Sequence, residues 1–151
     1  MSTATLRGPS PNYDYLQAEH YRITGPAVPS TAKLARDSVR AALAVTGHPR
    51  LIDPARVCVS DAVAHVLPLM SGSALTVDVT VNRSRVIITV GDEDTDSRSS
   101  RRTMRREMDT APGLRLLCRL TYAAGVTRTW RRPGIGTSVW FELRDTGPVR
   151  R

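Results

Sequence analysis

The chain has 151 residues, a formal net charge of +8, and 40% hydrophobic but only 5% aromatic residues. This length fits one domain with short tails, and aliphatic side chains must fill most of its core. No run of about 18 apolar residues is present, which excludes a membrane-spanning helix. The polar stretch 1–11 lacks the apolar segment of a secretion signal, so we expect a cytoplasmic protein.

The positive charge comes almost entirely from arginine, because Lys33 is the only lysine. A basic excess can serve nucleic acid or an acidic protein partner. The many arginines and alanines are also typical of a GC-rich genome, which weakens the arginine content as a functional signal. No nucleic-acid recognition motif is present, so we rank nucleic-acid binding last. The single lysine lies in no GxxxxGK[ST] sequence, which excludes that phosphate loop.

The two cysteines, Cys58 and Cys118, lie far apart and have no CxxC partner. Both fall in apolar helical patterns, which predicts two reduced thiols in the core. A disulfide between them stays open as the alternative.

In chain order, residues 1–18 are predicted to be a tail, followed by a short strand around 20–24. Ser30 or Thr31 is expected to cap a first helix, which Gly47 ends. Its predicted core positions recur at helical spacing: Ala32, Ala35, Val39, Ala42 and Leu43.

A second helix is predicted to begin with Asp53 as cap and Pro54 in its first turn, and to end near Pro68. Alternating apolar residues over 75–81 predict a half-buried strand, and the apolar stretch 86–90 predicts its antiparallel partner.

The stretch 91–112 has no core periodicity, which is typical of a lid or a long loop. A third helix is expected from Leu114 to Ala124, ended by Gly125. Residues 126–131 and 137–143 predict a second hairpin, and 145–151 a tail. The predicted fold is therefore α+β: a two-layer sandwich with a mixed, mostly antiparallel sheet of about five strands, covered on one face by three helices over 19–144.

Three places could carry chemistry. Asp61 and His65 share one helix face because they lie four residues apart; they could act as a general base and a metal ligand, or simply contact each other. Asp92 ends a strand, where its carboxylate could accept a hydrogen bond from an amine or face solvent. Gly113 opens a helix, where a phosphate could approach backbone N–H groups, or it forms an ordinary turn.

Five arginines cluster within residues 98–106 without interleaved aromatic residues, so no stacking platform for single-stranded nucleic acid is present. The cluster is interpreted as a solvated loop, with clamping of nucleotide phosphates or docking of an acidic partner as the alternatives.

In this order, the motifs resemble the histidine-kinase-like ATPase domain of the GHKL superfamily, and most closely the actinobacterial anti-sigma-factor serine kinases. Residues 59–65 stand where that family has its Ser-Glu-Leu-Val-Thr-Asn box, and 90–92 where its adenine-binding aspartate ends a strand. Residues 113–117 resemble the second half of the Gly-x-Gly-Leu phosphate motif, and 136–143 the Gly-Thr-x-Val ending. The resemblance extends over residues 20–144.

This resemblance implies a Bergerat-type ATP-binding fold, ATP and Mg²⁺ as cofactors, and a sigma factor or a STAS-domain anti-anti-sigma protein as partner. It makes Asp61 the catalytic base and His65 the metal position. The implied nucleotide-binding residues are His65, Asp92, Gly113, Leu114 and Thr137.

The sequence departs from the family at several of these positions. Asp61 replaces the glutamate base, His65 replaces the Mg²⁺-binding asparagine, and imidazole is a poor Mg²⁺ ligand. Glu93 and Asp94 stand in place of glycines, and Ala111-Pro112 in place of the first phosphate-motif glycine.

We therefore expect a transcription regulator of the anti-sigma kinase type with weakened or lost ATP binding. The alternatives are a catalytically inactive interaction module of the same fold and a basic nucleic-acid-binding protein. The sequence leaves open whether the protein forms a homodimer.

Overall fold

The computed structural model describes residues 18–70, 74–92, 102–103, 112–130 and 135–146. Residues 1–17 of the predicted tail 1–18 and the acidic residues after Asp92 lie outside these ranges, as does Ala111. Of the arginine cluster, only Arg102 lies within them. None of the described helices is long and apolar enough to cross a bilayer.

The described strands form one open sheet with the order β1-β2-β3-β6-β5-β4. Every pairing in it is antiparallel, so the parallel component expected of a mixed sheet is absent from the described strands. Five strands have eight or more residues, and β4 has two. The strands are β1 (Glu19–Pro26), β2 (Ala74–Val81), β3 (Arg85–Asp92), β4 (Arg102–Thr103), β5 (Ala123–Trp130) and β6 (Ile135–Arg144).

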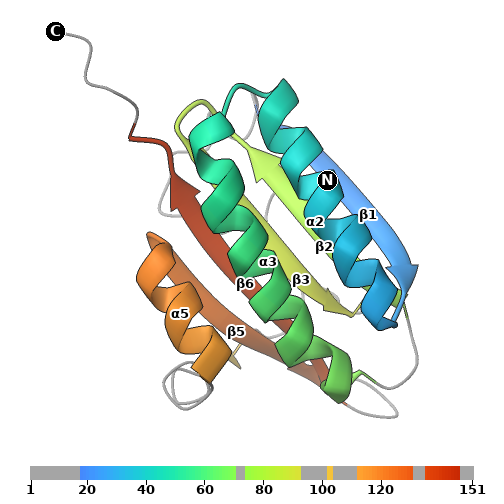
Figure 1. Cartoon of the computed structure of the whole chain (residues 1–151). Coiled ribbons are helices and arrows are strands. Elements are labelled where there is room, and N and C mark those ends of the chain that lie inside the picture. Colours follow the sequence, from blue (N-terminus) through green and yellow to red (C-terminus); the bar gives the residue numbers. More distant parts are fainter. Residues whose placement is uncertain (1–17, 71–73, 93–101, 104–111, 131–134, 147–151) are drawn as a thin grey trace, which may run out of the picture.

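Three α-helices lie on the same face of this sheet (Figure 1). They are α2 (Pro29–Val45), α3 (Ile52–Val66) and α5 (Pro112–Leu120), with short 3-10 turns η2 (Pro49–Leu51) and η3 (Leu67–Leu69) before and after α3. The prediction of an α+β fold with three helices on one sheet face is confirmed.

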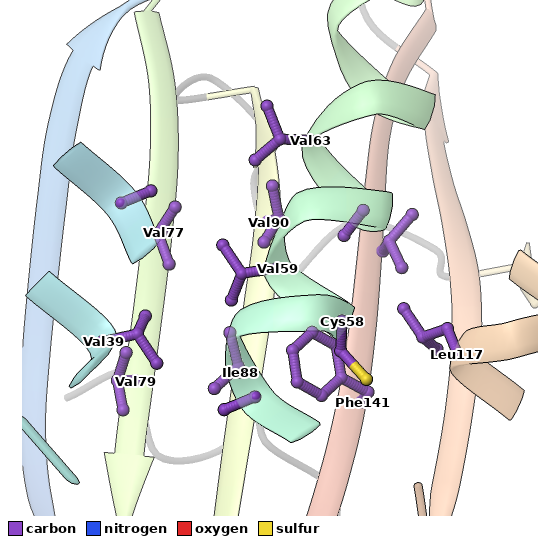
Figure 2. Packing of buried hydrophobic residues seen from close by; sticks show 14 of the residues in the cluster. Val39, Cys58, Val59, Val63, Val77, Val79, Ile88, Val90, Leu117 and Phe141 are labelled. Carbon is purple, nitrogen blue, oxygen red and sulfur yellow. The ribbon is translucent and has the colours of Figure 1, made fainter. Parts of the chain in front are cut away.

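The core lies between the helices and the sheet, and strand alternation determines which side chains enter it. Val77 and Val79 of β2, and Ile88 and Val90 of β3, point toward the helices, where Val59 of α3 packs on them (Figure 2). Each is almost completely buried. The alternating pattern of 75–81 thus predicted which side chains face the helices, but the strand is more than half-buried, because Thr76 and Thr80 on the opposite face are buried as well.

The starts of the first two helices differ from the prediction. Val28 is the N-cap of α2 and makes no side-chain cap bond, and Pro29 begins the helix. The predicted cap Thr31 instead donates its hydroxyl hydrogen to the carbonyl of Pro26 (2.6 Å). The α3 helix follows directly from η2, so Asp53 lies inside its first turn rather than at its cap.

Of the two helix ends predicted at a glycine, one is confirmed and one is wrong. Gly47 has a φ of +84°, which a glycine adopts without strain, and it follows the end of α2 as predicted. The α5 helix ends at Leu120, so Gly125 lies in β5 and does not end a helix. A side chain there would collide with Trp140, since a Cβ at Gly125 would lie 2.5 Å from the indole Nε1.

A buried histidine holds the chain end against the sheet. His48, in the turn after α2, is 3% exposed. Its Nε2 donates to the carbonyl oxygen of Asn82 in the β2–β3 turn (2.8 Å), and its Nδ1 lies 2.9 Å from a carboxylate oxygen of Asp145. Asp145 was predicted to begin a tail, yet its backbone N–H also donates to the Ser84 carbonyl (2.9 Å).

We predict that His48→Ala lowers the free energy of unfolding by about 2–4 kcal/mol, because two hydrogen bonds, one to a carboxylate, are lost in a buried place. Urea denaturation measures this loss. His20→Ala, at an exposed histidine of β1, is the matched control and should cost less than about 1 kcal/mol. Equal losses in the two variants would contradict a clamping role for His48.

Candidate functional site

Asp92 and Thr137 lie just beyond the last pair of the β3–β6 ladder. The ladder ends with Val90 opposite Val139 and Gly91 opposite Ser138, so continuing the same register would put Asp92 near Thr137. Val90 and Val139 are core residues on the helix side. Because side chains alternate, Asp92 and Thr137 point to that same side. Thr137 is buried and Asp92 is half-buried.

Gly91 allows β3 and β6 to approach closely beside this pair. A Cβ at Gly91 would lie 2.5 Å from the Cβ of Ser138 and 3.0 Å from the carbonyl oxygen of Thr137. No side chain fits at that distance, so glycine is required immediately before Asp92. The sequence analysis did not assign Gly91 a role, although a glycine directly before a strand-ending aspartate was a visible signal.

The orientation of α3 follows from its neighbours on either side. On one flank, Arg36 of α2 donates to the hydroxyl of Ser60 (3.3 Å), so that flank faces α2. On the other flank, Cys58 lies next to Phe141 of β6 and toward Leu117 of α5 (Figure 2).

Asp61 lies three residues after Cys58, and His65 lies seven residues after it. Both intervals are close to whole helical turns, so these side chains continue the flank of α3 that faces α5. The helix therefore carries the predicted base and the predicted metal position on the same side as α5.

Asp61 is held in a poorly hydrated place. Its Oδ2 atom is buried and has no hydrogen-bond partner. Desolvation raises the pKa of its carboxyl, because burial disfavours the charged form. Burial, with a smaller effect of Asp61, likewise raises the pKa of the Cys58 thiol to about 12. Cys58 is thus an inert core thiol, as predicted.

Cys118 differs from that prediction. It lies on α5 and is exposed, and no disulfide joins it to Cys58. Within the described part of α5, Leu114 and Leu117 are completely buried and form the inner stripe of the helix. The next residue after Leu117 falls outside this narrow stripe, which explains why the apolar pattern misassigned Cys118 to the core.

The start of α5 lies at the same end of the sandwich as the end of β3. Figure 1 shows the last turns of α3, the end of β3, the start of β6 and the start of α5 all at this end. Gly113 belongs to the first turn of α5, where backbone N–H groups lack helical partners. The Leu114 side chain is in the core, so only its backbone is available to a ligand.

Taken together, the fold places all six predicted positions at one end of the sandwich, on the helix side of the sheet. Asp92 and Thr137 come from the sheet, Asp61 and His65 from α3, and Gly113 and Leu114 from the first turn of α5. Among the described residues, no three His, Cys, Asp or Glu side chains cluster as they would around a metal ion. Comparisons with protein-family models and with curated protein sequences gave no match.

We predict that Asp61→Asn stabilises the protein at neutral pH, by about 2–4 °C in melting temperature if roughly 1 kcal/mol is gained. The folded-state pKa of this carboxyl is raised, so its ionised form costs stability above that pKa. The cost disappears as the pH falls through the folded pKa toward the unfolded value of about 3.9.

Thermal melts of both proteins across this pH range measure the effect. The two melting temperatures should converge in acid. A difference that is constant with pH, or a less stable variant at pH 7, would contradict the desolvation of Asp61.

Proposed function

We propose that this chain is a cytoplasmic regulatory protein that binds an adenine nucleotide in a Bergerat-type fold and acts through contact with a protein partner. The observation that supports this proposal is the β3–β6 register, which ends at Gly91 and Ser138, so that Asp92 and Thr137 follow it from neighbouring strands. A carboxylate and a hydroxyl at this position suit a ligand with an exocyclic amine beside a ring nitrogen, as adenine has.

The proposed role of each residue in binding follows from its position. Asp92 accepts a hydrogen bond from the adenine amine, and Thr137 adds a hydroxyl that can donate or accept. The backbone N–H groups in the first turn of α5 have no partner within the helix, and the positive end of the helix dipole suits the phosphate end of the ligand. Gly91 keeps β3 and β6 close together next to Asp92, because a side chain there would collide with Ser138 on the other face of the sheet.

The site lacks groups that phosphoryl transfer needs. Phosphoryl transfer depends on metal-assisted positioning and on charge neutralisation around the transferred group. Asp61, the proposed base, is one methylene shorter than the glutamate of the resembled family, and His65 offers a nitrogen where Mg²⁺ prefers oxygen. We therefore propose a regulator with weak nucleotide binding and little or no kinase activity, resembling an anti-sigma-factor serine kinase.

Nucleotide binding is tested with a fluorescent or calorimetric titration of adenosine, ADP and ATP. We predict that Asp92→Asn weakens binding by about 10- to 100-fold, because a hydrogen bond to a charged group is replaced by a mismatched amide. Asp53→Asn, an exposed position in the first turn of α3, is the matched control and should leave affinity unchanged. If the two variants bind alike, Asp92 does not hold the ligand.

The partner is proposed to be a sigma factor or a STAS-domain antagonist, following the resemblance. We predict that the purified chain forms a stable complex with a member of one of these classes from its own genome, measurable by calorimetry or size-exclusion chromatography. Phosphate transfer to a serine of that partner should be negligible. If no sigma factor or STAS protein binds, the regulatory assignment falls, while the nucleotide titration still decides the ligand.

A further inference from the structure

The flank of α3 that carries Asp61 and His65 does not fit a magnesium ion. Mg²⁺ requires oxygen ligands in a nearly ideal octahedron at about 2.1 Å, and it gives up its water reluctantly. His65 supplies only nitrogen at the position where the resembled family has an amide oxygen. Within the described ranges, no cluster of three His, Cys, Asp or Glu residues replaces the lost ligand.

Asp61 does not supply the missing oxygen ligand for Mg²⁺. Its side chain is short, its Oδ2 atom is buried without a hydrogen-bond partner, and its surroundings are apolar enough to disfavour the ionised form. A metal ligand must be deprotonated, and the burial that disfavours the ionised form of this carboxyl therefore also weakens it as a ligand.

We infer that the site binds its adenine nucleotide without a divalent cation, so that adenine rather than the phosphates anchors the ligand. This inference rests on the proposed function. The inference follows from the contrast between the residues proposed to hold adenine and those proposed to hold the metal ion. Asp92 and Thr137 offer adenine a carboxylate and a hydroxyl, whereas Asp61 and His65 do not offer Mg²⁺ a set of oxygen ligands.

Without a cation, added phosphates should no longer increase the affinity of the nucleotide. The start of α5 offers roughly half a positive charge from its backbone dipoles, whereas ATP carries several negative charges. Each further phosphate also lies nearer to the uncompensated carboxylate of Asp61. Adenosine should therefore bind about as tightly as ATP, within roughly tenfold, instead of much more weakly.

The experiment titrates the full chain with adenosine, ADP and ATP, once in EDTA and once in millimolar Mg²⁺. We expect each affinity to agree between the two conditions within about threefold, a difference of less than 1 kcal/mol. Binding of ATP only in the presence of Mg²⁺ would overturn the inference and leave the proposed function intact. Absence of binding in both conditions would overturn the proposed function and this inference with it.

Two variants and one control variant test the inference further. His65→Asn restores an oxygen ligand and should make ATP binding at least about tenfold tighter with Mg²⁺ than in EDTA. His20→Asn, the same exchange on exposed β1, should show no such dependence. Asp61→Asn removes the repelling charge and should strengthen ATP binding in EDTA relative to adenosine. If His65→Asn stays insensitive to Mg²⁺ and Asp61→Asn does not favour ATP, this flank of α3 does not face the phosphates and the inference is wrong.

Discussion

The packing of α3 on the centre of the sheet is the contact on which the rest of the structure depends. This helix touches α2 and α5 on its two sides and β3 and β6 beneath it. Its inner face is apolar and almost completely buried, and each large side chain of this kind contributes about 1.5–3 kcal/mol by leaving water. The buried residues are Ala55, Cys58, Val59, Ala62, Val63 and Val66.

Because these side chains determine the rotation of α3 about its axis, they also determine where the polar residues between them point. Ser60 faces α2, while Asp61 and His65 continue the flank that carries Cys58. The partial desolvation of Asp61 is a consequence of this packing, since the residue lies at the edge of the buried face of the helix. A residue that lowers the folding stability in this way is typical of functional sites, where groups needed for chemistry are not those that pack best.

The sequence predicted the parts of the fold that depend on local periodicity. The β2–β3 hairpin, the buried face of β2 and the role of Gly47 follow from alternation and from backbone freedom, which are properties of a few neighbouring residues. The helix caps and the end of α5 were wrong because tertiary contacts compete with local preference there. The hydroxyl of Thr31 bonds to Pro26 across the turn, and Gly125 is held under Trp140 by strand pairing.

By itself, the sequence determined the α+β fold class and the order of most elements, because hydropathy patterns are written along the chain. Only the tertiary structure decided that Gly91 lies opposite Ser138, that glycine is needed there, and that Leu114 is core. The same holds for the clamp between His48 and Asp145. These facts depend on the register between strands distant in sequence and on the rotation of packed helices, which no local pattern encodes.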